Sequence, residues 1–382
     1  NIPWTGGSLF LETSAQRMDL FSEHKYSWQT SPIMIGYRQS LFGYNSLKWD
    51  KRIEPVRYQE AKKSYVETLE LVSANAINKF FALATAQSNY DIASFNYANA
   101  DTLYRYAQGR YNIGTITENE MLQLELNRLT EETNRMNARI EMDNCMQELR
   151  SYLGIQEERE IRVRVSSRIP DFSINLNEAL ALAYENSPDI QTMKRRKLES
   201  ESAVARARAN AGLKADIYLR FGLTQTADKL PEAYRNLLDQ QYVSLSISLP
   251  ILDWGRGKGQ VRVARSNRDL VYTQVEQSRT DFELNVRKLV KQFNLQTQRV
   301  RIAARTDETA QRRNEVARKL YILGKSTILD LNASISEKDS ARRNYVSALY
   351  NYWSLYYTLR SMTLYDFESN KLLTEDYNLL IE

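Results

Sequence analysis

The sequence predicts a mainly α-helical protein with a small β part, built from two copies of a strand–strand–long helix–helix unit. Two stretches of about 65 residues contain almost no glycine or proline, which is typical of long helices. Short segments with alternating apolar residues precede each stretch, which is typical of strands. The two halves also match at a constant offset of 210 positions, so the predicted copies are residues 1–169 and 170–382.

Four strands are predicted, in two pairs. In 242–252, every second residue is aliphatic and the residues between include three serines, which is the pattern of a two-faced strand. The segment 33–41 keeps this alternation 210 positions earlier, and 217–224 alternates in the same way. Leu9 and Leu11 begin a weaker fourth strand. The β part therefore covers about 7–42 and 215–252, with polar hairpin loops at about 20–31 and 229–240.

An open sheet of this kind would expose an aliphatic face and two unpaired edges to water. A soluble protein would cover the aliphatic face with helices. A membrane protein would close the sheet with strands from other chains, aliphatic side chains toward lipid and serines toward a wet interior. Because each strand pair runs almost directly into a very long helix, the pattern favours the membrane solution.

The long helices follow the strands. Between 44 and 108 the only proline is Pro55, near the start, and 260–323 contains neither glycine nor proline. Both stretches are rich in the helix formers Ala, Glu, Gln, Arg, Lys and Leu. A helix of this length spans about 100 Å and needs long partners to bury its apolar stripe. The α part is expected at about 44–165, 175–212 and 254–368.

Each long helix ends at a short break, Tyr-Asn-Ile-Gly at 111–114 and Tyr-Ile-Leu-Gly at 321–324. The second break continues as Gly-Lys-Ser-Thr, which resembles the end of a phosphate-binding loop. That loop needs a glycine where this chain has Lys319 and a strand where it has a helix, and the first copy of the break has no lysine. The two glycines are instead predicted to be left-handed residues that end one helix, and the following Thr and Ser residues to cap the next.

The helices after the breaks carry apolar residues at alternating steps of four and three, which predicts a heptad seam. In the first copy these are Ala138, Met142, Cys145, Leu149 and Tyr152. In the second copy they are Ala341, Tyr345, Ala348, Tyr352, Leu355, Leu359 and Met362. Cys145 is therefore expected to be a buried structural thiol.

Residues 176–211 are predicted to form one helix that ends at Gly212. The matching segment of the first copy would fall before Asn1. We therefore expect the sequence to be a fragment that lacks this helix and any targeting signal before it.

The strand-to-helix joint at 253–260 contains three glycines and two cations, which suggests either a flexible joint or a phosphate site. The first-copy segment 40–48, which corresponds to 250–258, keeps only one glycine, which favours the joint. The predicted joint residues are Gly43, Pro250, Gly255 and Gly257. Trp254, Tyr44 and Trp49 lie near the joints, where an aromatic belt would meet lipid headgroups.

Composition argues against several other functions. The chain has one histidine and one cysteine, which argues strongly against a histidine-based zinc site or a Ser-His-Asp triad. We therefore expect no enzyme activity, metal or cofactor. The basic and acidic residues are interspersed, and the basic run 194–197 is interpreted as a solvated helix face rather than a nucleic-acid patch. The alternatives that stay open are a soluble coiled-coil scaffold, a membrane-surface helical protein and a tyrosine-rich nucleic-acid binder.

Three features together resemble one family. They are the strand and joint SLSISLPILDWGRGKGQV at 244–261, the helix start LNEALALAYENSPDI at 176–190, and the Tyr-x-x-Gly breaks. In this order they resemble the TolC-type outer-membrane efflux proteins over nearly the whole chain. The resemblance implies a homotrimer with one twelve-stranded barrel in the bacterial outer membrane and an α-helical barrel across the periplasm. It also implies a passive exit duct.

The resemblance further implies partners and site residues. A periplasmic adaptor would join the duct to an inner-membrane pump of the RND or ABC type, lipid would surround the barrel, and no nucleic acid would bind. The adaptor-contacting tips would be Asn112, Ile113, Gly114, Thr115, Tyr321, Leu323, Gly324, Lys325 and Ser326. A pore constriction would be formed by Glu118, Glu120 and Asp330, although an acidic first helical turn explains these residues equally well. The family often has proline before each joint, but here only the second joint has it, as Pro250, and Ser40 stands in the first.

Overall fold

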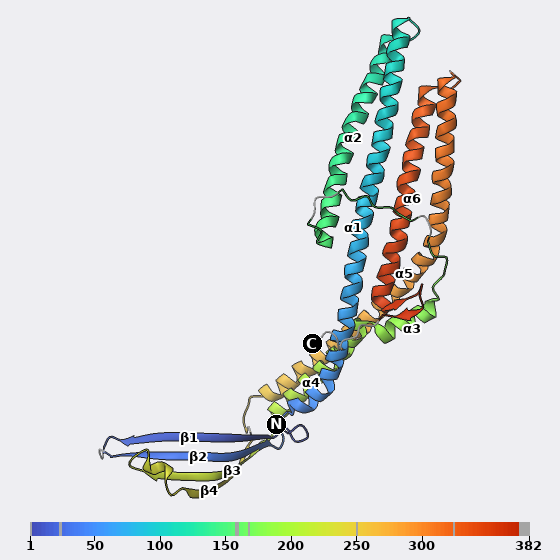
Figure 1. Cartoon of the computed structure of the whole chain (residues 1–382). Helices are drawn as coiled ribbons and strands as arrows, with labels where there is room; N and C mark the ends of the chain where they lie inside the picture. The colour runs from blue at the N-terminus through green and yellow to red at the C-terminus, as the bar shows by residue number, and fades with distance from the viewer. Residues whose placement is uncertain are drawn as a thin grey trace. The chain divides into compact units, whose positions relative to one another are not determined.

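Figure 1 shows the computed structural model of the chain, which describes residues 2–22, 25–156, 160–166, 169–249, 251–323 and 325–373. It is mainly helical with a small strand part, as predicted. The chain divides into two compact units. We call them the strand unit, Asn1–Lys62 with Pro188–Asp281, and the hairpin unit, Lys63–Ser187 with Phe282–Glu382.

The strand unit contains one antiparallel sheet with the order β1-β2-β3-β4. Its strands are β1 (Ser8–Leu20), β2 (Lys25–Ser40), β3 (Lys214–Ala227) and β4 (Leu238–Ser248). The central pairing of β2 with β3 joins the two halves of the sequence, and Ile35 lies opposite Phe221. Four strands were expected, and four form this sheet in the described part of the chain.

The strand ends differ from the prediction. The expected loop at 20–31 is largely paired strand, since β2 begins at Lys25 and Gln29 lies opposite Gln16. The expected loop at 229–240 is also shorter, because β4 begins at Leu238 and a 3₁₀ turn, η1 (Glu232–Tyr234), occupies part of it. Polar residues on both faces hide the apolar alternation there, but backbone pairing continues. At its other end β4 stops at Ser248, so the predicted strand 242–252 was wrong beyond that residue.

The long helices are α1 (Ser46–Asn112) and α5 (Arg256–Ile322), each of 67 residues. The helices after the breaks are α2 (Glu118–Leu153) and α6 (Ile328–Thr363), each of 36 residues. The bounds of α5 and α6 lie 210 positions after those of α1 and α2, so the expected long helices and their constant offset are confirmed. Among the described residues, every helix is too polar or too short to be a membrane span.

The predicted helix at 176–211 is two helices, α3 (Leu176–Asn186) and α4 (Pro188–Ala211). Ser187 is extended between them, with φ −62° and ψ 136°. Proline disfavours a helical conformation in the residue before it and has no N–H to donate to the preceding turn. The single-helix prediction was therefore wrong at Pro188, where a new helix begins.

In the strand unit, α4 packs on both long helices. The Arg195 guanidinium lies 2.6 Å from the carboxylate of Glu60 on α1, and Lys197 lies 2.7 Å from Glu276 on α5. Arg195 also bonds Glu199 one turn along α4. The bond from Arg195 lowers the pKa of Glu60, so this partly buried carboxylate stays charged.

The hairpin unit contains two helical hairpins, α1 with α2 and α5 with α6 (Figure 1). Leu83 and Ala86 of α1 pack on Met142 and Leu149 of α2, which confirms these two residues of the predicted first seam. Cys145 packs against this cluster but is half-buried rather than fully buried. Its burial raises the pKa of the thiol. A two-stranded sheet, β5 (Tyr365–Asp366) and β6 (Lys371–Leu372), follows α6.

The second seam packs more tightly than the first. Phe293 of α5 lies 5.2 Å, between ring centroids, from Tyr352 of α6, and both side chains are fully buried. Leu359 is also fully buried, and Ala341 and Ala348 lie along the same face. The heptad spacing therefore identified the packed face of α6 correctly.

Candidate functional site: the hairpin ends, the joints and the sheet faces

The first hairpin end forms as the glycine pattern predicted. Helix α1 ends at Asn112, and Gly114 has φ 70°, a left-handed conformation that glycine adopts without strain. The Gly114 N–H donates to the Tyr111 carbonyl at 2.9 Å, and the Thr115 N–H donates to the Arg110 carbonyl at 2.9 Å. Ile113 is 74% exposed. The turn therefore presents an apolar side chain to its surroundings.

The second hairpin end has the same plan where it is described. Tyr321 lies in the last turn of α5, and the Lys325 N–H donates to the Leu320 carbonyl at 2.9 Å. Leu323 is 67% exposed, which matches the exposure of Ile113. Gly324, a predicted tip residue, lies outside the described residues.

Both helices after the breaks begin at an expected threonine cap, Thr117 or Thr327, and each cap is a capping box. The Thr117 N–H donates to the Glu120 carboxylate at 2.8 Å, and the Glu120 N–H donates back to the Thr117 hydroxyl at 3.3 Å. Thr327 and Asp330 make the same reciprocal pair, each backbone bond 3.2 Å long. These bonds lower the pKa values of Glu120 and Asp330, so both exposed carboxylates are ionised at neutral pH.

Two further predicted residues surround these caps. Glu118 is the first residue of α2 and is exposed. The Ser326 hydroxyl donates to the Asp330 carboxylate at 3.3 Å. The structure therefore assigns Glu120 and Asp330 a helix-capping role.

A small cavity near the hairpin ends was missed by the sequence analysis. It has a volume of about 230 Å³ and includes the predicted tip residue Tyr321. Its other lining residues are Asn99, Thr102, Leu103, Tyr106, Asn314, Arg318, Leu331 and Ile335. They come from α1, α5 and α6, so only the three-dimensional packing brings them together.

The second joint is organised by Asp253, a residue the sequence analysis did not single out. Its carboxylate accepts the Gly255 N–H at 2.9 Å and the Gly257 N–H at 2.8 Å, which lowers the pKa of Asp253. Gly255 has φ 79°, and a Cβ on Gly257 would lie 2.8 Å from the Asp253 carboxylate. Because this carboxylate occupies the N–H groups that a phosphate would need, the joint interpretation is favoured. Pro250 lies outside the described residues.

The first joint is built differently. A Cβ on Gly43 would lie 2.4 Å from the Ser40 hydroxyl, so the chain is closely packed on itself there. The Asn45 side chain accepts the Lys48 N–H at 3.0 Å and caps α1. The first joint is thus held by the amide side chain of Asn45, and the second by the carboxylate of Asp253.

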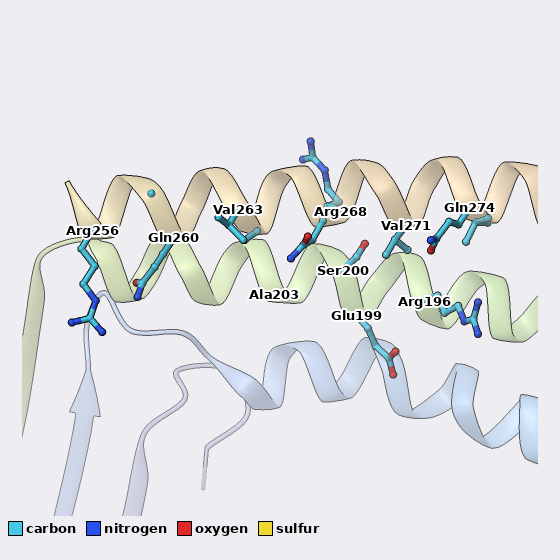
Figure 2. Close-up of a pocket in the computed structure, with 14 residues that line it drawn as sticks. Arg196, Glu199, Ser200, Ala203, Arg256, Gln260, Val263, Arg268, Val271 and Gln274 are labelled. Atoms are coloured by element: carbon cyan, nitrogen blue, oxygen red, sulfur yellow. The ribbon is translucent and has the colours of Figure 1, made fainter. Parts of the chain in front are cut away.

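A groove of about 970 Å³ lies between α4 and α5 in the strand unit (Figure 2). Its lining includes Ala203 from α4 and Val263 and Val271 from α5, together with Arg196 and Arg256. Neither histidine nor cysteine lines it, and the lining resembles a helix-packing surface rather than a reaction site. In the described ranges, no group of three or more His, Cys, Asp or Glu residues is arranged to hold a metal ion.

The two faces of the sheet differ in chemistry. Tyr37, Leu219 and Val243 lie opposite one another across β2, β3 and β4, and the alternation places the other aliphatic residues on this face. Eight large apolar residues of the strands are each between 47% and 75% exposed. They are Leu9, Leu11, Ile33, Ile35, Phe221, Val243, Leu245 and Ile247. The opposite face carries serines and an ion pair, with Arg220 3.7 Å from Glu12.

Comparison with known proteins shows which proteins the chain resembles. Residues 179–363 match the family described as outer membrane efflux protein. The chain is 21% identical over 311 residues to the outer membrane protein TolC of Escherichia coli (strain K12), covering 78% of this chain and 61% of TolC. The expected resemblance to outer membrane efflux proteins is therefore confirmed.

Solved structures agree in fold. The CmeC outer membrane channel of Campylobacter jejuni aligns with 99% of this chain and 81% of its own, with a TM-score of 0.76 and 15% identity. The outer membrane protein VceC of Vibrio cholerae aligns with 94% of this chain and 86% of its own, with a TM-score of 0.72 and 15% identity. At this identity the likeness establishes the fold alone. The chain spans 61% of the length of TolC.

Proposed function

We propose that this chain forms a passive exit duct in the bacterial outer membrane, with a long periplasmic portion. The observation that carries the proposal is the sheet, which has an exposed aliphatic face on one side and serines and an ion pair on the other. Such a sheet suits lipid on its first face and water on its second. The family match and the shared fold with outer membrane channels support the same function.

The duct is a homotrimer. In the described sheet, β1 and β4 are the outer strands, and each has an unpaired edge. Membrane-spanning sheets must close because lipid offers no hydrogen bonds to free edges. Three copies of four strands would make one twelve-stranded barrel, and the hairpins of three copies would continue it as an α-helical barrel.

The hairpin ends are the docking points for a periplasmic adaptor, which joins the duct to an inner-membrane pump of the RND or ABC type. Ile113 and Leu323 are exposed apolar side chains at equivalent positions of the two turns, which suits a protein partner. The cargo would be small molecules, such as drugs or toxins, or exported products. The pump rather than the duct would supply the energy and choose the cargo.

The caps of α2 and α6 also form the narrow entrance of the duct. Glu120 and Asp330 are held ionised by their bonds to Thr117 and Thr327. Three copies would place six such carboxylates near one axis, together with Glu118. A ring of fixed negative charge favours cations and resists anions.

The proposal is tested by fractionating cells that express the full-length protein and measuring the mass of the protein extracted in detergent. We expect the protein in the outer membrane and a particle of three chains. A water-soluble monomer or a two-chain rod would contradict the duct and would favour the coiled-coil scaffold.

A further inference from the structure

Positive charge is concentrated at one end of the sheet, where the strands meet the helices. Three segments, 44–52, 206–216 and 253–265, contain ten Lys or Arg residues and three Asp residues, a net charge of +7. The whole chain carries +5, so the remainder of the chain is slightly acidic. We call these three segments the basic cluster. Its cations are Lys48, Lys51, Arg52, Arg206, Arg208, Lys214, Arg256, Lys258, Arg262 and Arg265.

The fold brings the three segments to the same place. Near its start, β3 pairs with the ends of both β2 and β4, since Asp216 lies opposite Ser40 and Lys214 lies opposite Ser248. Helix α4 ends close to these pairs, and α1 and α5 begin close to them. The basic cluster therefore lies at one end of the sheet (Figure 1).

The cations of the basic cluster have few partners within the chain. All ten are exposed. Among the described residues, Arg52 alone of the ten forms an ion pair, 3.9 Å from the Glu201 carboxylate. The Arg206 guanidinium lies 4.7 Å from the centroid of the Tyr44 ring, which brings no negative charge to it. The Asp253 carboxylate is bonded to backbone N–H groups. The chain itself thus leaves most of this positive charge without a counter-charge.

Exposed apolar residues lie between the basic cluster and the aliphatic face of the sheet. Phe42, just after β2, is 55% exposed, and Ile251, just after β4, is 92% exposed. Trp254 is 89% exposed. Lys and Arg side chains beside an apolar layer can bury their stems in it and extend their charged ends to the headgroups. If the aliphatic face contacts lipid, as proposed, the basic cluster lies at the level of the lipid headgroups.

An acidic phospholipid fits this position and this charge. Its phosphate accepts charge-assisted hydrogen bonds from Lys and Arg, and clusters of about four to eight cations at a membrane surface attract anionic lipids. Because α1 and α5 begin at this end of the sheet, the proposed periplasmic position of the long helices makes the facing leaflet the periplasmic one. Lipids of the outer leaflet would meet the opposite end of the sheet.

We propose that the basic cluster binds acidic phospholipids of the periplasmic leaflet. The inference rests on the proposed duct and names the lipid that the duct selects. The phosphates contact Lys and Arg side chains, since Asp253 occupies the backbone N–H groups of the second joint. Salt screens the attraction between exposed charges, so the selection weakens as the ionic strength rises.

Trp254 can report which lipid lies beside the basic cluster. A full-length variant keeps this tryptophan and has Phe in place of Trp4, Trp28, Trp49 and Trp353. It is reconstituted into vesicles with brominated phosphatidylglycerol or brominated phosphatidylcholine, which quench the fluorescence of a neighbouring tryptophan. At low salt we expect phosphatidylglycerol to bind beside Trp254 about fivefold more tightly than phosphatidylcholine. The ratio of the two binding constants should approach one in about 1 M salt.

Substitutions along α5 test whether the basic cluster causes the preference. The test variant removes four cations of the cluster and should bring the ratio close to one; it carries Arg256→Gln, Lys258→Gln, Arg262→Gln and Arg265→Gln. The matched control removes four exposed cations farther along α5 and should keep the fivefold ratio; it carries Arg299→Gln, Arg305→Gln, Arg312→Gln and Lys319→Gln. An unchanged ratio in the test variant, or an equal fall in both variants, would overturn the proposal.

A measurement on the unsubstituted protein needs no variant to fold. The phospholipids that remain on the wild-type particle after extraction in mild detergent are identified by mass spectrometry. We expect acidic phospholipids to be enriched relative to the membrane from which the protein was extracted. The same composition on the particle and in the membrane would overturn the proposal.

A second single-tryptophan variant, which keeps Trp28 of β2 instead, separates the possible failures. Equal quenching of Trp254 by the two lipids would overturn the lipid selection and leave the duct standing. Quenching of Trp28 without any quenching of Trp254 would also overturn the selection, because the joint would then lie away from lipid. If neither lipid quenched either tryptophan, the sheet would lie outside the membrane, and both the selection and the proposed function would be overturned.

Discussion

The two hairpins of the hairpin unit have the same length but different cores. Leu83 of α1 and Phe293 of α5 stand 210 positions apart, and both are fully buried. Met142 and Tyr352 form a second equivalent pair, again both buried. At these two positions the first hairpin has Leu and Met, whereas the second has Phe and Tyr. Duplication therefore kept helix length and the buried positions, while the side chains that fill them changed.

The difference extends to the extended segments that the hairpins hold. On the first hairpin, the Gln87 side chain accepts the Val163 N–H at 3.1 Å and donates to the Ile161 carbonyl at 2.9 Å. On the second, Asn294 makes the equivalent pair of bonds to Ile174, both 2.9 Å long. An amide side chain does the same work in both, but from different positions along the helix.

The largest effect is expected from truncating the two cores. Phe293→Ala should destabilise the protein by about 4 kcal/mol and Leu83→Ala by about 3 kcal/mol, because the larger buried ring leaves the larger cavity. Denaturant unfolding followed by circular dichroism measures both. An equal or larger loss from Leu83→Ala would show that the aromatic core is the looser one.

A somewhat smaller effect is expected at Arg360, which the second hairpin uses to hold α1. Its guanidinium lies 2.9 Å from Glu70 and 3.5 Å from Asp366, and its side chain is only 16% exposed. The repeat places Thr280 where α1 has Glu70, so this ionic contact occurs in one copy of the repeat only. Arg360→Met leaves the two carboxylates without this cation. It should lower the free energy of unfolding by about 3 kcal/mol. Arg360→Lys, which keeps the charge, should recover part of the loss in the same unfolding measurement.

The caps should behave alike in the two hairpins. Thr117→Ala and Thr327→Ala each remove a capping-box hydroxyl and should each cost about 1 kcal/mol. Faster amide hydrogen exchange should be confined to the first turn of α2 or of α6. Thr130→Ala, in the middle of α2, is the control and should leave those turns unchanged. If only one of the two substitutions lowered the free energy of unfolding, the two hairpin ends would not be equivalent.

The smallest effect on stability is expected from the entrance carboxylates, which should instead control ion selectivity. Glu120→Gln with Asp330→Asn should reduce the preference for cations in planar-bilayer recordings. The capping bonds hold both pKa values below their ordinary values of 4.5 and 3.8. The contribution of the caps to the free energy of unfolding is therefore fully present above these ordinary values. It is lost as the pH falls through the lowered pKa values. Selectivity should stay constant from neutral pH down to about pH 5, and a decline above that pH would contradict the assignment.

Much of this fold was predictable because its signals are local. The glycine of the first break, the caps Thr117 and Thr327 and the seam residues Met142 and Leu149 all follow from spacing along one helix. The break at Pro188 was visible in the sequence, but the helix-forming residues on both sides outweighed it.

Other features depend on contacts that spacing does not reveal. The strands continue through polar residues such as Gln16 and Gln29 because partner strands pair with them. The contacts of the Asp253 carboxylate at the second joint depend on the folded backbone. The small cavity near the hairpin ends, which Tyr106 helps to line, also forms only when three helices pack together. Adaptor docking, the pore constriction and the assembly stay predictions, since they require other chains.

The most direct test of the trimeric duct is an image of the full-length protein in lipid nanodiscs by electron cryomicroscopy. We predict three copies around one axis, with twelve strands closed into a single barrel in the lipid. A particle in which the four strands of one chain pack on helices outside the lipid would contradict the account.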